Sequence, residues 1–308
     1  GCSSDVWTSA DSQTQDEEAV NALESVWSDT DLNVMLDAPV ETLDPQKAVD
    51  SASFEVIADF MDGLMQMGAD GRAVTALCDY YELSQDHCTY TFFLREDARW
   101  SNQTPVTAQD FVFAWQRAVD PEIDAEYGYL FELGQVKNAG EIRSGLQDKS
   151  SLGVKALDQK TLQVELNAPV TYFTALLCLP VYYPLNEEFY RSCNGKYGTS
   201  PETVLANGAF ILDAYIPWAT SFHLKKNPDY YGAARVSLSG IGYQVIQDAE
   251  HALLSYEAGL LDEAKVGSRY VEQMKSDADF TSIDTGNLWY VCPNIAENTA
   301  LSDRKSVV

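Results

Sequence analysis

The sequence is poor in basic residues and in histidine, and each shortage excludes a class of function. Among 308 residues there are 20 Lys and Arg against 47 Asp and Glu, which gives a formal net charge of −27. A surface of that charge repels nucleic acid and anionic lipid, so we expect no nucleic-acid partner. The three histidines, His87, His223 and His251, are isolated in the sequence, which excludes a zinc hydrolase with an HExxH helix.

Short catalytic motifs are also missing. There is no GxSxG nucleophile elbow and no P-loop, and the segment SGIGYQ has two glycines where a dinucleotide site needs three. The longest apolar stretch, ALLCLPVYYPL at 175–185, is too short and too interrupted by proline to cross a bilayer. An acid-pair hydrolase stays open, because 47 carboxylates bring some pairs together. We expect a protein that is not an enzyme and needs no cofactor or metal.

The six cysteines offer neither a disulfide framework nor metal-ligand spacing. Five lie inside the chain, an odd number without CxxC spacing, and most are expected to be small buried hydrophobic residues. These five are Cys78, Cys88, Cys178, Cys193 and Cys292. The sixth, Cys2, precedes an acidic stretch, since the first 46 residues hold eleven acids and no Lys or Arg.

Residues 1–31 are predicted to be a largely disordered acidic tether, because they are polar and show little apolar periodicity. Gly1-Cys2 at its head resembles the mature end of a bacterial lipoprotein, where the cysteine thiol carries lipid. The alternative is an ordinary free cysteine.

Hydrophobic spacing predicts a mixed α/β architecture. Helical spacing of apolar residues predicts a helix over 53–67. Alternation predicts hairpins at 80–94 and 153–166, and two strands on either side of 215–220. The segment that follows predicts a strand and then an amphipathic helix that ends at Gly259.

The segment RWSNQTPVTAQDFVFAW, residues 99–115, carries a strongly specified helix start. Thr107 and Asp110 fit the capping-box pattern, and the helix is expected to stop at Asp120, before a proline. Trp115 lies on its apolar face. None of the side chains is an obvious nucleophile or base, so we interpret the segment as structural.

Aromatic residues in predicted loops are candidates for a ligand cleft, because rigid rings offer contact area at low entropic cost. Core packing or loop anchoring is the alternative that we expect for most of them. The residues are Tyr127, Tyr129, Tyr182, Tyr183, Tyr215, Trp218 and Trp289.

Five segments together resemble the extracytoplasmic oligopeptide-binding proteins of ABC importers, bacterial solute-binding protein family 5. In chain order they are ETLDP, YTFFLREDARWSNQTPVTAQDFVFAWQRAVDP, NGAFIL, LKKNPDYYG and LLSYEAGLLD. The resemblance implies an α/β fold with periplasmic-binding-protein-like type II lobes, mixed sheets and an extra smaller domain. It covers the chain from about residue 32 to the end.

The resemblance also implies a domain division. Residues 1–31 would be the lipoprotein anchor and tether, and 32–45 plus 169–285 would form a discontinuous first lobe. Residues 46–168 would form the smaller domain, and 286–308 would start the other lobe, which is incomplete in this chain. With half a clamp, the 308-residue chain is expected to bind peptides weakly or not at all.

Carried over residue by residue, the resemblance places peptide-backbone contacts at one loop and cleft-facing side chains in three other segments. Glu41 could equally be a solvated loop acid, and Trp289 could equally be core. The predicted ligand-binding residues are Pro39, Val40, Glu41, Tyr127, Leu179, Asn287 and Trp289.

The implied function is that of a lipoprotein on the extracellular face of the bacterial cytoplasmic membrane, anchored through Cys2. It would capture oligopeptides and deliver them to the transmembrane subunits of an ABC permease. Alternatives are a family member for nickel, haem or an oligosaccharide, a peptide-pheromone receptor, an adhesin, and the acid-pair hydrolase. Few histidines argue against the metal cases.

Overall fold

The computed structural model describes residues 30–282 of the chain. The chain divides into two compact units, with the boundary between Lys265 and Val266. The first unit contains all the strands of the described residues and helices α2 to α8. The described part of the second unit contains one short helix, α9 (Val271–Met274).

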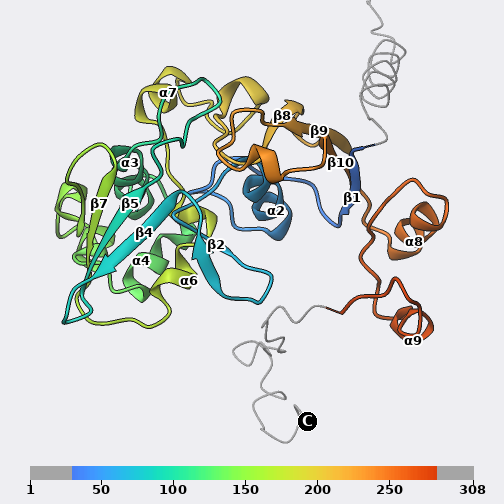
Figure 1. The fold of residues 1–308 in the computed structure, drawn as a ribbon, viewed down its shortest axis with the longest axis horizontal. Coiled ribbons are helices and arrows are strands. Elements are labelled where there is room, and N and C mark those ends of the chain that lie inside the picture. The colour runs from blue at the N-terminus through green and yellow to red at the C-terminus, as the bar shows by residue number, and fades with distance from the viewer. Residues whose placement is uncertain (1–29, 283–308) are drawn as a thin grey trace, which may run out of the picture. The chain divides into compact units, whose positions relative to one another are not determined.

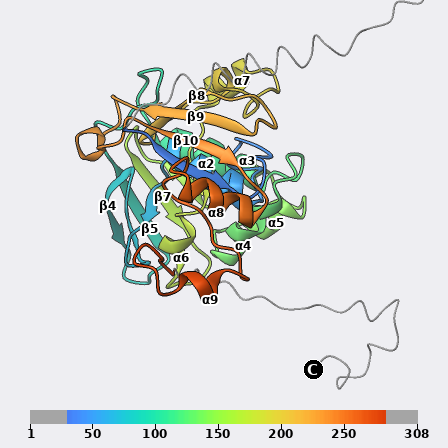
Figure 2. The same cartoon turned by 90° about the vertical axis from the view of Figure 1, so that its right-hand side faces the viewer.

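A four-stranded mixed sheet brings the start of the chain beside segments two hundred residues away. Its order is β1-β10-β9-β8, with β1 parallel to β10 and the other neighbours antiparallel. Figure 2 shows these strands side by side. Their bounds are β1 (Leu32–Leu36), β8 (Phe210–Ala214), β9 (Ser221–Lys226) and β10 (Gly240–Val245).

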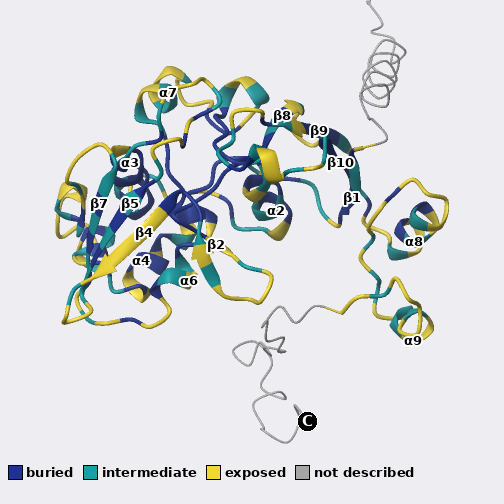
Figure 3. Cartoon of the chain, viewed as in Figure 1, coloured by how far each residue is buried: buried dark blue, intermediate teal, exposed yellow. Residues whose placement is uncertain are grey.

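A second four-stranded sheet is antiparallel throughout, in the order β4-β5-β7-β6. Strands β5 and β7 alternate between buried and half-buried positions, as expected for strands with one face on a core. The edge strand β4 is exposed along most of its length (Figure 3). The bounds are β4 (Cys78–Leu83), β5 (Thr89–Leu94), β6 (Val154–Ala156) and β7 (Thr161–Glu165).

Short elements connect the two sheets (Figure 1). A two-stranded hairpin consists of β2 (Met65–Met67) and β3 (Ala73–Thr75). The α-helices of the first unit are α2 (Ser51–Phe60), α3 (Ala108–Val119), α4 (Leu130–Leu133), α5 (Ala139–Arg143), α6 (Phe173–Leu176), α7 (Glu187–Ser192) and α8 (Ala249–Glu257). The 3₁₀ turns are η1 (Glu126–Tyr129), η2 (Lys149–Ser151), η3 (Pro180–Tyr182), η4 (Pro201–Thr203) and η5 (Ala233–Arg235).

One continuous cluster of buried side chains reaches from the first sheet through α2 and α3 to the second sheet. A smaller cluster holds α8 against the ends of β1 and β10; it consists of Met35, Ile246, Ala252 and Leu261. The predicted mixed α/β architecture is therefore confirmed, as are the predicted hairpins, the strands around 215–220 and the helix before Gly259.

The predicted capping box at the start of α3 is present. The backbone N–H of Asp110 donates to Thr107 Oγ1 at 3.4 Å, and the backbone N–H of Thr107 donates to Asp110 Oδ2 at 2.8 Å. The indole of Trp100 donates to the same Asp110 oxygen at 3.0 Å. Burial raises the pKa of Asp110 to about 6 against these hydrogen bonds. Trp100 and Trp115 are fully buried, so the segment is a structural corner, as expected.

The prediction of a helix over 53–67 was wrong at both ends. Helix α2 begins at Ser51 and ends at Phe60, and residues 65–67 form β2. The backbone N–H of Asp62 donates to the Asn207 side chain at 2.7 Å, which replaces the next helical hydrogen bond. A Cβ at Gly63 would lie 2.7 Å from the Tyr183 ring. Partners distant in sequence therefore override the local helical spacing.

The expectation of mostly buried cysteines was also wrong for the part of the chain that the structure describes. Cys78 is buried, whereas Cys88, Cys178 and Cys193 are half-buried and unpaired. The latter three lie in a hairpin turn or just after short helices, where the chain turns towards solvent. Cys292 lies outside the described residues.

The sheets bear on the predicted domain division without fixing its boundaries. All strands of the first sheet come from 32–45 and 169–285, and all strands of the second come from 46–168. However, α2 packs against β8 of the first sheet, although the division would assign it to 46–168. The boundaries therefore stay a prediction. Cys2 and the segment 286–308 lie outside the described residues, as does all of the predicted tether except residues 30 and 31.

Candidate functional site

The first turns of α2 organise a loop and two cavities. Asp50 caps the helix, because its side chain accepts a hydrogen bond from the backbone N–H of Ser53 at 2.7 Å. The Ser53 hydroxyl in turn accepts hydrogen bonds from the backbone N–H groups of Glu41 and Thr42, at 3.1 and 3.2 Å. The loop that follows β1 is therefore fixed to α2.

The predicted peptide-contacting residues of this loop differ in exposure. Val40 is 3% exposed and belongs to the core, Pro39 is half-buried, and Glu41 is exposed. Because the backbone N–H of Glu41 is already used by Ser53, the Glu41 carboxylate is the group of that residue open to solvent. Val40 acts as the anchor that holds the loop in place.

An apolar cavity of about 200 Å³ brings together two predicted residues that lie 52 positions apart, Tyr127 and Leu179. The ring of Tyr127 lies between those of Phe54 and Tyr129, with centroid distances of 5.6 and 6.0 Å. The complete lining is Phe54, Tyr127, Tyr129, Leu130, Leu179, Pro180 and Val181. A cavity of this kind suits an apolar side chain of a ligand.

Two short turns hold these walls in place. Tyr127 lies on η1, which packs against the end of α3, and a Cβ at Gly128 would lie 2.3 Å from the Ala118 carbonyl oxygen. Only glycine permits this approach. Leu179 is the residue before η3, and its side chain is 36% exposed at the cavity.

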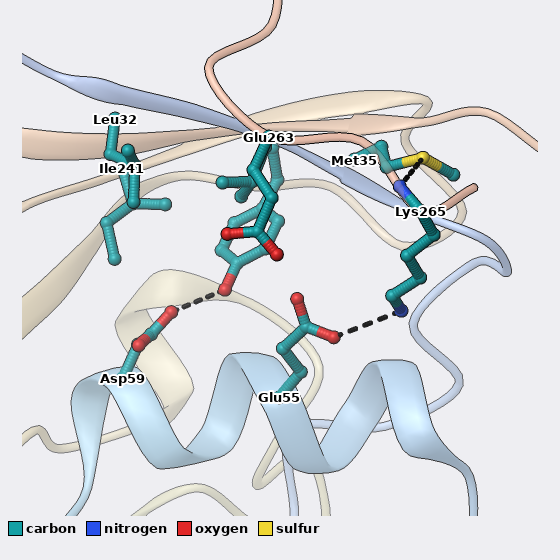
Figure 4. Close-up of a pocket in the computed structure, with 9 residues that line it drawn as sticks. Leu32, Met35, Glu55, Asp59, Ile241, Glu263 and Lys265 are labelled. Carbon is teal, nitrogen blue, oxygen red and sulfur yellow. Dashed lines mark hydrogen bonds and ion pairs between the residues drawn. The ribbon is translucent and has the colours of Figure 1, made fainter. Parts of the chain in front are cut away.

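A polar cavity of about 180 Å³ lies between α2 and the first sheet (Figure 4). Three of its acids point into it, Glu55 and Asp59 from α2 and Glu263 from the segment beside β1. The hydroxyl of Tyr243 donates to Asp59. Burial raises the pKa of Asp59 to about 7, with Glu55 adding to the rise and the Tyr243 hydrogen bond opposing it.

Lys265 is the cation of this polar cavity. Its Nζ lies 3.4 Å from Glu55 and 3.5 Å from Asp37, and its backbone N–H donates to Met35 Sδ at 3.2 Å. The pKa of Glu55 is raised by burial, although Lys265 opposes the rise. With three acids and one lysine, the cavity favours a cationic group of a ligand over an anionic one.

The other predicted aromatic residues divide between core and surface. Tyr182, Tyr183 and Tyr215 are buried, whereas Trp218 is 67% exposed at the tip of the β8–β9 hairpin. Sequence reasoning missed Phe54, Glu55 and Asp59 as site residues. Phe54 was placed on an apolar helix face, and no local signal tells a half-buried residue there from a core one. Asn287, Trp289 and Cys2 lie outside the described residues.

The described residues contain neither a membrane-spanning helix nor a cluster of metal-binding side chains. No helix between residues 30 and 282 combines the length and the hydropathy that a bilayer crossing requires. Within the same range, no group of three or more His, Cys, Asp or Glu side chains is arranged to hold a metal ion.

This chain is similar to proteins that are named for binding peptides or another solute. It is 36% identical over 235 residues to the dipeptide-binding protein of Lactococcus lactis subsp. cremoris (strain MG1363). The aligned region covers 75% of this chain and 42% of that protein. It is 35% identical to the "Probable deoxycholate-binding periplasmic protein YgiS" of Escherichia coli (strain K12), over 72% of this chain and 41% of that one.

A solved structure shows the same fold. Peptide-bound OppA of Listeria monocytogenes superposes with a TM-score of 0.78 at 35% identity, over 82% of this chain and 50% of that one. The chain thus spans about half the length of the relatives it matches. Residues 72–306 match the family described as "Bacterial extracellular solute-binding proteins, family 5 Middle". The expected family and fold are confirmed: the chain belongs to the bacterial extracellular solute-binding proteins of family 5.

Proposed function

We propose that this chain is part of an extracytoplasmic protein that captures oligopeptides and delivers them to an ABC permease. The observation that carries the proposal is the apolar cavity in which Tyr127 and Leu179 lie together. Phe54, which lines the cavity, follows Ser53, which fixes the loop; this suits an extended peptide whose side chain enters the cavity while its backbone meets the loop. Similarity to peptide-binding relatives supports this ligand class.

The polar cavity is proposed to attract the positively charged groups of a peptide. A peptide presents an α-amino group and, in many sequences, basic side chains, and three acids on α2 and the segment beside β1 attract such groups. Asn287 and Trp289 are proposed to add backbone contacts. Anchoring through a lipid on Cys2 would hold the protein at the outer face of the cytoplasmic membrane.

The deoxycholate named for one relative is a second candidate class, favoured by the apolar lining of the cavity around Tyr127. A steroid carboxylate has no cationic group for the polar cavity, and its charge would be repelled there. Peptide is therefore the ligand that fits both cavities.

The test is an NMR titration of the isotopically labelled chain with a pool of tri- to pentapeptides, a method that detects millimolar binding. We expect shifts concentrated at residues that line the Tyr127 cavity and at the loop fixed by Ser53. Leu179→Ala should weaken binding about fivefold through lost apolar contact. Leu157→Ala, at a leucine that is 46% exposed and outside both cavities, is the matched control.

Peptide-induced NMR shifts at other residues only would contradict the proposed site. Equal peptide binding by the two leucine variants would contradict it as well. Binding of deoxycholate without binding of peptide would show that a steroid, and not a peptide, is the ligand. Calorimetry measures the dissociation constant, and micromolar or tighter peptide binding would overturn the expectation that the 308-residue chain binds peptides weakly or not at all.

A further inference from the structure

A third cavity, of about 460 Å³, is lined by two arginines and by no acidic residue. Its walls come from the β2–β3 hairpin, from Arg95 just after β5 and from the loop that contains η5. It shares no lining residue with the two cavities beside α2. In a chain with a net charge of −27, a recess whose charged lining residues are both arginines calls for a specific explanation.

Arg95 is held in a fixed orientation at this cavity. Its Nε donates to the Ala76 carbonyl at 2.6 Å, and its guanidinium carbon lies 4.8 Å from the centroid of the Tyr231 ring. Asp79 is its ion-pair partner at 3.6 Å, and that carboxylate is 61% exposed, so solvent screens the pair. Asp79 therefore neutralises the charge of Arg95 only weakly.

Arg235 has no side-chain hydrogen bond or ion pair to any residue between 30 and 282. Its guanidinium folds back over Gly232, where a Cβ would lie 3.0 Å from Nη2 and 2.6 Å from the Tyr230 ring. The glycine leaves room for this arrangement. An unpaired guanidinium lining a recess provides several N–H donors in a planar fork, which matches carboxylate and phosphate oxygens.

Asp62 is a buried acid close to this cavity; burial raises its pKa, and the charge of Arg95 opposes the rise. Asp62 accepts hydrogen bonds from the hydroxyls of Tyr230 and Tyr231, at 2.9 and 2.6 Å, and is not among the lining residues. Tyr230 and Tyr231 therefore direct their hydroxyls to Asp62, which leaves Arg95, Arg235 and the side chains of Gln66 and Thr75 as polar groups of the lining.

We propose that the cavity between Arg95 and Arg235 binds a small soluble anion that carries a phosphate or carboxylate group. Two guanidiniums with one aromatic partner form a recognition unit for such a group. The ligand is small because the strongly negative protein repels an extended anionic surface or polymer. This site is separate from the proposed peptide site, so either proposal can fail without the other.

The test measures the thermal midpoint of the full 308-residue chain with inorganic phosphate, with succinate, and with chloride at matched ionic strength. At ten times the dissociation constant of the bound anion we expect a rise of about 2 to 4 °C over chloride. Arg235→Gln should abolish that rise. Arg235 is exposed, so this variant should fold, as circular dichroism will check.

Arg72→Gln is the matched control, because Arg72 is an exposed arginine at the turn of the β2–β3 hairpin and does not line the cavity. It removes the same charge and should keep the rise. A rise with phosphate alone or with succinate alone supports the site and assigns its anion. No rise over chloride with either anion, or an equal rise in the Arg235 variant, overturns the proposal.

Discussion

Helices α2 and α3 are both capped by a side chain that accepts a hydrogen bond from a first-turn amide, Asp50 in α2 and Thr107 in α3. They then differ in what surrounds them. Nine of the 12 residues of α3 are buried, against five of the 10 residues of α2. The half-buried residues of α2, Phe54, Glu55 and Asp59, are those that line the two candidate ligand cavities.

The difference shows how one scaffold separates stability from recognition. Helix α3 pairs two of its buried polar side chains within the protein. Trp115 Nε1 donates to the Tyr182 carbonyl at 2.8 Å, and Arg117 forms a bidentate pair with Asp44, although Arg117 Nε has no hydrogen-bond partner among the described residues. Helix α2 leaves a ring and two carboxylates at its surface, where a ligand can reach them. The same cap chemistry therefore supports a core element in one case and a binding surface in the other.

The largest expected effect is on the α3 side of the comparison. Arg117→Ala leaves the Asp44 carboxylate buried without its ion pair, because the two side chains are 4% and 5% exposed. We expect a loss of about 3–5 kcal/mol in the free energy of unfolding, measured by denaturant titration. Arg191→Ala removes an ion pair with Glu187 in which both side chains are exposed, and should lower the free energy of unfolding by less than about 1 kcal/mol. Equal costs would show that the buried pair has no special role.

Removing the two caps sharpens the comparison. Thr107→Ala and Asp50→Ala should each lower the free energy of unfolding by about 1 kcal/mol, because each removes a hydrogen bond to a first-turn amide. Only Asp50→Ala should also weaken peptide binding, since it loosens Ser53 and the loop that Ser53 holds. A loss of peptide binding in a folded Thr107 variant would show that α3 contacts ligand.

A further effect is a change in pH dependence from α2. The pKa of Asp59 rises from 3.8 to about 7 on folding, so its protonated form is stabilised by the fold. That contribution is fully present below about pH 4 and is lost as the pH rises through about 7. The neutral Asp59→Asn variant should therefore show a flatter decline of the free energy of unfolding between pH 4 and 7. Parallel curves for the two proteins would contradict the raised pKa.

Local patterns predicted the elements whose signals are complete within a few residues. The Thr107–Asp110 capping box, the β4–β5 and β6–β7 hairpins and the stop at Asp120 follow from neighbours in the chain, and the structure has them. The helix over 53–67 failed because two residues far away in sequence interrupt it: Asn207 accepts the backbone N–H of Asp62, and the Tyr183 ring lies close to Gly63. Of the candidate site, Tyr127 and Leu179 came from family resemblance, and the structure places them in one cavity.

By itself the sequence determined the family, the mixed α/β class and the capped corner at 99–119, because these depend on patterns that are local along the chain. Only the tertiary structure decided that Phe54 and Glu55, adjacent on α2, face different cavities, and that Arg95 and Arg235 share a third. Such groupings are set by which distant segments pack together, and no spacing along the chain encodes them.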